Sequence, residues 1–270
     1  MPKPTLISIT GGLGNQLFQY AHGRKLEIID KKSIVFNTSF FTNPHAKQNS
    51  QKDTPRPFLL DRFNINPQAK FSPNPENGII KIFKKILYKI TGNYPLYQSE
   101  RYFASIKDTI LKEFTLKNPL SDQAQNAYNS IRLQTNSVSL HIRRGDYAKN
   151  PHALKHHGLI ELDYYKKATE FIKTKINNPL FFIFSDDIEW VRKNLKIENC
   201  VFISNPKIAE TEEMYLMSQC SHNIIANSTF SWWGAYLNQN QGKIVVAPKQ
   251  WTVKKTADEL EIIPKNWIQI

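Results

Sequence analysis

From residue 137 onward, short apolar runs alternate with segments of helical periodicity, and this alternation limits the possible folds more than any other feature of the chain. The apolar runs cover residues 138–142, 180–184, 200–203, 223–226 and 243–246. The helical segments that follow or separate them cover residues 163–175, 188–195, 210–219 and 229–237. Continuous apolar strands that alternate with helices predict a parallel sheet with helices on both faces. We therefore expect an α/β protein.

The N-terminal half begins with a similar unit. An apolar strand over residues 6–9 leads into a glycine-rich turn at 11–14, a helix over 15–29 and a second strand over 33–36. Residues 38–78 are rich in Asn, Pro, Ser and Gln and predict loops with short elements of secondary structure. This organisation predicts an N-terminal domain over residues 1–134, a second α/β domain over 135–258 and a C-terminal tail over 259–270.

Three polar clusters follow strands of the expected C-terminal sheet, at residues 141–146, 185–187 and 227–229. Ligands of parallel sheets bind beyond the carboxyl ends of the strands, so we expect the three clusters to converge. Arg143 and Arg144 present guanidinium forks that match phosphate oxygens, although a surface ion pair with Asp146 is the alternative. The first cluster therefore predicts an anion site.

The other two clusters each open a helix. Ser228 and Thr229 stand where backbone N–H groups and the helix dipole favour an anion, or where a side chain simply caps the helix. Asp186 and Asp187 are equally suited to binding a guanine edge or a ribose and to capping. Tandem Trp232 and Trp233 are interpreted as core residues.

The glycine turn at residues 11–14 only partly matches a dinucleotide-binding fingerprint. Leu17 stands where the third glycine would be, and the following strand ends in Asn37 instead of an acidic residue. Both departures argue against a nicotinamide-dependent oxidoreductase. A backbone brought close to a substrate, with Asn15 donating a hydrogen bond, fits the turn better.

The formal net charge of +13 suits nucleic acid, an anionic membrane or a phosphorylated small molecule. Lysines interleaved with exposed aromatic residues, typical of nucleic-acid binding, are absent from the sequence. Residues 79–90 form a basic amphipathic pattern, which predicts either a helix on the bilayer surface or an ordinary helix packed on the core. Two cysteines and no long apolar run lead us to expect a cytoplasmic protein. The first alternative for residues 79–90 would add peripheral contact at the inner face of the cytoplasmic membrane, and the second would not.

The seven histidines show no metal-binding spacing, so no metal is expected. His152, His156 and His157 cluster in the loop after the arginines, where one of them is a candidate to take a proton from a substrate hydroxyl.

Three segments, residues 11–21, 141–147 and 227–235, together resemble the bacterial α-1,2-fucosyltransferases. Residues 184–190 and 157–168 fit the same pattern, so the resemblance spans nearly the whole chain in the same order. It implies a GT-B-like fold, with two Rossmann-like domains that face each other across a cleft. It also implies transfer of L-fucose from GDP-fucose to the 2-hydroxyl of a terminal galactoside, with inversion and without a metal.

The implied setting is the synthesis of a surface polysaccharide or O-antigen, in which the galactose-terminated acceptor is often lipid-linked. The alternatives are a transferase that uses another sugar nucleotide or forms another fucosyl linkage. A basic nucleotide- or nucleic-acid-binding protein without catalytic activity is the more distant alternative.

The resemblance also assigns residues. Arg143 would grip the β-phosphate of the donor, His141 would lie beside the nucleotide, and Asp186 or Asp187 would lie near the guanine. The full implied donor site comprises His141, Arg143, Arg144, Asp186, Asp187, Asn227, Ser228, Thr229 and Phe230.

The N-terminal domain would face the acceptor through Gly12, Gly14, Asn15 and Gln16, with Asn15 also toward the leaving group. Asp146 and His157 are the two candidates for the base that deprotonates the acceptor hydroxyl.

Overall fold

The computed structural model describes residues 3–42, 56–74, 96–145, 148, 154, 158–252 and 261–270. The chain forms two compact units, Met1–Thr115 with Lys254–Pro264, and Leu116–Val253 with Lys265–Ile270. The division after Thr115 falls earlier than the boundary expected at residue 134, because residues 122–132 form a helix that packs within the second unit. The arrangement of the two units across a cleft stays a prediction.

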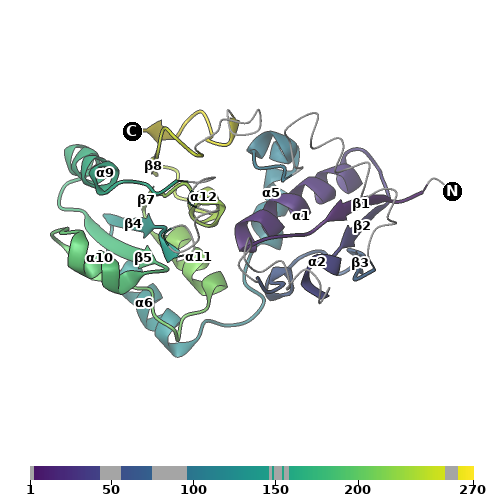
Figure 1. Ribbon diagram of the computed structural model, residues 1–270, viewed down its shortest axis with the longest axis horizontal. Helices are drawn as coiled ribbons and strands as arrows, with labels where there is room; N and C mark the ends of the chain where they lie inside the picture. Colours follow the sequence, from purple (N-terminus) through teal and green to yellow (C-terminus); the bar gives the residue numbers. More distant parts are fainter. Residues whose placement is uncertain are drawn as a thin grey trace. The chain divides into compact units, whose positions relative to one another are not determined.

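The first unit contains a parallel sheet in the order β1-β2-β3. Its strands are β1 (Thr5–Ser8), β2 (Ile34–Asn37) and β3 (Phe71–Ser72). Helix α1 (Leu13–Ile28) connects β1 to β2 and packs against both (Figure 1). The strand–turn–helix–strand unit expected from the sequence is therefore confirmed, and β3 is one of the short elements expected within the loops of residues 38–78.

Short helices complete the described part of this unit. They are α2 (Ser39–Thr42), α5 (Lys107–Glu113) and the 3-10 turns η1 (Leu60–Arg62), η2 (Glu100–Tyr102) and η3 (Ala104–Ile106).

A buried ion pair joins α1 to α5. The Nη2 atom of Arg24 lies 2.8 Å from Oε1 of Glu113, and each residue is only 9% exposed. The Tyr20 hydroxyl donates a hydrogen bond of 2.6 Å to Oε2 of the same carboxylate. Burial and the neighbouring Glu113 raise the pKa of Tyr20, so its hydroxyl stays protonated and acts as the donor. The three side chains satisfy one another in a site with little access to water.

The second unit contains a six-stranded parallel sheet in the order β6-β5-β4-β7-β8-β9. Its strands are β4 (Ser137–Ile142), β5 (Leu180–Ser185), β6 (Cys200–Phe202), β7 (His222–Ile224), β8 (Val245–Ala247) and β9 (Ile268–Gln269). Its helices are α6 (Asp122–Arg132), α9 (Leu162–Lys175), α10 (Ile188–Asn194), α11 (Glu210–Gln219) and α12 (Thr229–Tyr236). The parallel α/β architecture expected for this region is confirmed.

Helices cover both faces of this sheet, as Figure 1 shows. On one face, alternate residues of β4 and β5 pack against Tyr165 and Ile172 of α9 and Val191 of α10. On the other face, Phe182 and Phe184 of β5 pack against α6 and α11. Because successive side chains of a strand point to opposite faces and both faces are covered, β5 is apolar from Leu180 to Phe184.

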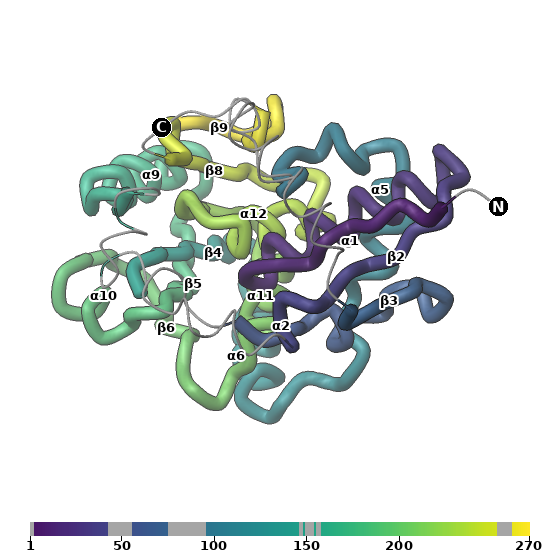
Figure 2. Tube along the Cα trace, turned by 45° about the vertical axis from the view of Figure 1, so that its right-hand side comes forward, coloured from purple at the N-terminus to yellow at the C-terminus, as the bar shows by residue number. Residues whose placement is uncertain are grey.

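The last residues of the chain, expected to form a tail, belong instead to the second unit. Strand β9 pairs with β8, and the two lie side by side in Figure 2. Trp267 packs against Trp232 with ring centroids 5.4 Å apart. Trp232 and Trp233 are both fully buried, which confirms their interpretation as core residues.

Candidate functional site

The first and second polar clusters meet at the carboxyl ends of β4 and β5. Ile142 pairs in register with Ser185, so the residues that follow each strand leave the sheet side by side. The Nη1 atom of Arg143 lies 2.7 Å from Oδ2 of Asp186. Oδ1 of Asp186 accepts backbone hydrogen bonds from the N–H groups of Arg144, at 2.8 Å, and Gly145, at 2.9 Å. A single carboxylate therefore contacts three consecutive residues, 143–145, after β4.

The two arginines have different environments. Arg144 lies over the ring of Trp190, with its guanidinium carbon 3.3 Å from the ring centroid, and its Nε is 3.8 Å from Oδ2 of Asp187. The second distance is too long for a hydrogen bond, and this buried Nε atom makes none among the described residues. Arg144 is thus held mainly by stacking on Trp190, while Arg143 holds its charge beside Asp186.

His141 lies beneath this turn, at the end of β4. It is 3% exposed, and its Nδ1 atom has no hydrogen-bond partner among the described residues. Burial lowers the pKa of His141 to about 3, so the imidazole is neutral near pH 7. Its ring contacts that of Phe230, with centroids 5.5 Å apart, and this contact brings the third polar cluster to the same edge of the sheet.

The third cluster leads from β7 into α12. Asn227 is buried and donates a hydrogen bond of 3.1 Å to the Trp251 carbonyl. Ser228 occupies the N-cap position of α12, but its side chain makes no capping hydrogen bond. The first-turn N–H groups of a helix have no partner within the helix, and together with the dipole they attract anions. Thr229 and Phe230 stand in this first turn, so the cluster combines a helix N-terminus with Arg143 of the neighbouring strand end.

Glu213, on α11, is a further acidic residue of this region that the sequence did not single out. Burial raises the pKa of its carboxyl to about 7, with Glu210 and Asp186 adding repulsion, while a hydrogen bond with Ser204 opposes the shift. The Ser204 hydroxyl in turn accepts the N–H of Ser185 at the end of β5, at 2.9 Å. Glutamates are common in helices and nothing in the local pattern separates Glu213 from its neighbours, so only the packing of α11 reveals it.

This carboxyl yields a pH prediction. Between its unfolded pKa of 4.5 and its folded pKa of about 7, Glu213 holds a proton only in the folded state. Its contribution to stability is therefore complete below pH 4.5 and is lost as the pH rises through 7. The free energy of unfolding of the wild type should therefore fall between pH 5 and pH 8. In Glu213→Gln this fall should be smaller, by on the order of 2 kcal/mol.

Urea unfolding at several pH values measures this difference. The control is Glu170→Gln, whose side chain is 69% exposed and pairs with Lys173 on the surface of α9. Parallel pH profiles for the wild type and Glu213→Gln would contradict the assignment of a proton to Glu213.

In the first unit, the glycine turn precedes α1. Gly11 has a φ of +76°, a left-handed conformation that suits glycine, and Gly12 is the N-cap of α1. The helix begins at Leu13, slightly earlier than expected, so Gly14 and Asn15 lie within its first turn.

Two neighbouring amides of α1 have different roles. Gln16 is fully buried and its side chain bonds to the backbone of Gly11, Pro57 and Leu59, so it joins the turn to the 57–59 segment and presents nothing to solvent. The Oδ1 atom of Asn15 accepts a hydrogen bond of 2.8 Å from Gln98, which fixes the orientation of this amide. Gln98 is distant in sequence and carries no motif, so sequence reasoning missed it.

Asp146 and His157, the two candidate bases, lie outside the described residues, as do His152, His156 and residues 79–90. The described residues hold no group of three or more His, Cys, Asp or Glu side chains that could bind a metal ion. Among these residues, no helix is both long and apolar enough to cross a membrane.

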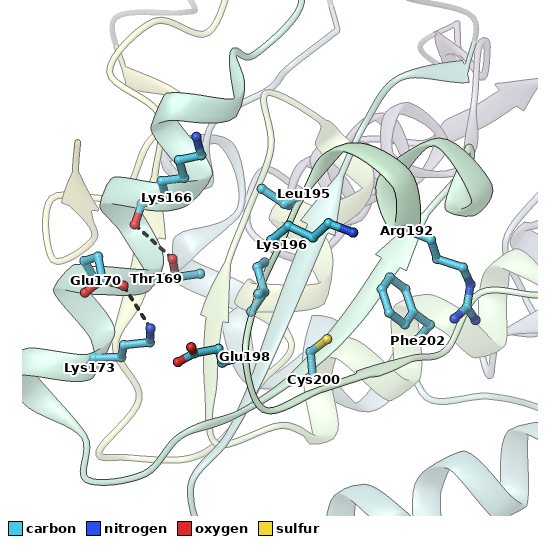
Figure 3. A pocket seen from close by; sticks show the side chains of 11 residues that line it. Lys166, Thr169, Glu170, Lys173, Arg192, Leu195, Lys196, Glu198, Cys200 and Phe202 are labelled. Atoms are coloured by element: carbon cyan, nitrogen blue, oxygen red, sulfur yellow. Dashed lines mark hydrogen bonds and ion pairs between the residues drawn. The ribbon is translucent and has the colours of Figure 1, made fainter.

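A cavity of about 550 Å³ lies elsewhere in the second unit, between α9 and the segment that enters β6 (Figure 3). Its charged lining consists of Lys166, Glu170, Lys173, Arg192, Lys196 and Glu198. None of the residues expected to form the donor site lines it. The polar edge of the sheet, rather than this cavity, is therefore the candidate functional site.

Comparison with known proteins gives consistent matches. Residues 91–270 match the model of glycosyl transferase family 11. The chain is 31% identical to the O-antigen biosynthesis glycosyltransferase WbnK of Escherichia coli, over 97% of this chain and 99% of the relative. It is 34% identical to an α-1,2-colitosyltransferase of Escherichia coli, over 97% of each.

More distant matches cover part of the sequence or the fold alone. The galactoside 2-α-L-fucosyltransferase SEC1 of Bos taurus is 31% identical over 55% of this chain and 42% of its own length. The crystal structure of NodZ α-1,6-fucosyltransferase, co-crystallized with GDP, aligns with a TM-score of 0.50 at 12% identity, over 86% of this chain and 92% of that one. At this identity the structural match concerns the fold only.

Proposed function

Because the chain belongs to glycosyl transferase family 11, we propose that it transfers L-fucose from GDP-fucose to the 2-hydroxyl of a terminal galactoside in O-antigen synthesis. The family, the α-1,2-colitosyltransferase and the galactoside 2-α-L-fucosyltransferase support α-1,2 transfer of a glycosyl group, and WbnK supports a role in O-antigen synthesis. The identity of the nucleotide and the sugar comes from the resemblance of the sequence motifs to α-1,2-fucosyltransferases.

The observation that carries the proposal is the joint position of Arg143 and the N-terminus of α12. Cleavage of a glycosyl–phosphate bond leaves negative charge on the departing diphosphate, and a preorganised cation and backbone N–H groups stabilise that charge. Arg143 supplies the cation, and the first turn around Thr229 supplies the dipole and N–H groups. In this proposal the neutral His141 lies beside the nucleotide, and no metal takes part.

The remaining steps concern the acceptor. A base takes the proton of the attacking hydroxyl, which then reaches the anomeric carbon from the face opposite the diphosphate and inverts it. Asp146 and His157 stay our candidates for the base. Asn15, whose amide is oriented by Gln98, is our candidate to contact the acceptor and the leaving group.

The test is an assay of GDP release with GDP-fucose, in the presence and absence of a panel of β-galactosides and of EDTA. We expect GDP release that depends on a galactoside with a free 2-hydroxyl and is unaffected by EDTA. A matched galactoside that lacks the 2-hydroxyl is the control for regiochemistry. Equal release from UDP-sugars would refute the donor assignment, and loss of activity in EDTA would refute metal independence.

A second candidate donor is favoured by the 34% identical relative, an α-1,2-colitosyltransferase. Colitose lacks the 3-hydroxyl of fucose, so both sugars would place the same diphosphate on the same cation. Parallel assays with GDP-fucose and GDP-colitose distinguish the two, and a higher kcat/KM for GDP-colitose would reassign the sugar while leaving the proposed linkage and the role of Arg143 unchanged.

A further inference from the structure

We propose that Asp186 is the positioning residue that fixes Arg143 and the turn after β4 in the arrangement that receives the diphosphate. This inference rests on the proposed function, because it assigns to Asp186 a task within the donor site. It also differs from the assignment expected from the sequence, in which Asp186 or Asp187 contacts the guanine.

The carboxylate of Asp186 already serves three donors of its own unit. Its Oδ1 accepts the N–H groups of Arg144 and Gly145, and its Oδ2 faces the Arg143 guanidinium at 2.7 Å. Charge-assisted hydrogen bonds of this kind are short and strong. The side chains of Arg143 and Asp186 are 17% and 26% exposed, so the pair is only partly screened by water. Asp186 therefore holds both the backbone of the turn and the direction of the Arg143 side chain.

Gly145 gives independent support, because it leaves room for this carboxylate. A Cβ atom at position 145 would lie 2.3 Å from Oδ2 and 2.8 Å from Cγ of Asp186. Such contacts are far inside van der Waals distance, so any larger residue would displace either the turn or the carboxylate. The turn and Asp186 are thus fitted to each other.

Asp187 is arranged differently. Its carboxylate lies 3.8 Å from Nε of Arg144, beyond hydrogen-bond distance, and its backbone N–H donates to the Ser185 hydroxyl. The sequence alone does not distinguish the two aspartates. In the structure, Asp186 is the one whose carboxylate contacts the turn after β4.

The substitution Asp186→Asn separates the two halves of this arrangement. The amide oxygen can still accept the N–H groups of Arg144 and Gly145, but the amide nitrogen replaces the oxygen that faces Arg143. We expect the affinity for GDP to fall about tenfold or more, since the ion pair that orients Arg143 is lost. The affinity for GMP, which has no β-phosphate, should change less than about twofold, within what unrelated surface changes produce.

Isothermal titration calorimetry with GDP and GMP measures both affinities. The matched control is Asp163→Asn, since Asp163 forms a pair of the same 2.7 Å length with Lys167 on an exposed face of α9. A second variant, Gly145→Ala, should displace Asp186 and so cause the same selective loss of GDP affinity. This variant tests the inference if Asp186→Asn does not fold.

A double-mutant cycle shows whether Asp186 acts through Arg143. Arg143→Gln should weaken GDP binding by itself, and adding Asp186→Asn to it should weaken binding little further. Equal losses for GDP and GMP, or a full additional loss in the Arg143→Gln background, would overturn the inference. A wild-type protein that binds GDP no better than GMP would instead refute the proposed function.

Discussion

Replacement of Arg143 by alanine is expected to lower the rate of glycosyl transfer by about 10²- to 10³-fold, as the loss of one preorganised group that stabilises developing charge typically does. Arg143 is the cation that the structure places at the joined ends of β4 and β5, paired with Asp186 and one strand away from the start of α12. Its contribution should be largest when the diphosphate departs, so kcat should fall more than the affinity for GDP-fucose. Steady-state kinetics of GDP release measures both effects.

Two variants control for the loss of an arginine. Arg192→Ala removes a guanidinium that lies over Phe202, away from the polar cluster, and should leave turnover within about twofold because surface changes of this kind are nearly neutral. Arg143→Lys keeps the charge but not the planar fork and should recover only part of the activity. Near-normal turnover of Arg143→Ala, with an unchanged melting temperature, would remove Arg143 from the site.

The largest expected effect on stability comes from the first unit. Arg24→Ala should lower the free energy of unfolding by about 3 kcal/mol or more, as happens when one partner of a buried ion pair is removed. The reason is that the Glu113 carboxylate would stay buried with the Tyr20 hydroxyl as its one remaining partner among the residues that the structure describes. Urea unfolding monitored by circular dichroism measures the change.

The next residue of the same helix is a matched control. Lys25 pairs with Asp30 at 2.9 Å, but their side chains are 28% and 29% exposed, so Lys25→Ala should cost no more than about 1 kcal/mol. Similar losses for Arg24→Ala and Lys25→Ala would contradict the view that burial makes the Glu113 pair important.

Local sequence patterns were sufficient for most of the second unit. Every expected strand from β4 to β8 is present. Strand β5 is the clearest, because burial on both faces makes it apolar from Leu180 to Phe184. Strand β9 was missed, since Ile268–Gln269 is too short to show any pattern and forms only by pairing with β8. Helix α6 was also not expected, and its contacts with α11 decide to which unit it belongs.

The position of the candidate site could be predicted from the sequence, but the contacts within it could not. The rule that ligands bind at the carboxyl ends of parallel strands was enough to bring Arg143, Asp186 and Ser228 to one edge. The binding of the Asp186 carboxylate to the turn after β4 depends on the register of β4 with β5, which no local pattern encodes. The same holds for Glu213 and Gln98, whose roles arise from contacts between distant segments.

The position of β9 affects how the second unit can be made. Its sheet takes its sixth strand from residues that follow Lys254–Pro264, a segment of the other unit, so no single continuous stretch of chain encodes it. A fragment that ends at residue 253 would lack Trp267 and leave β8 as an open edge, which favours aggregation. During synthesis, the sheet that carries Arg143 therefore stays incomplete until residues 268–269 have left the ribosome.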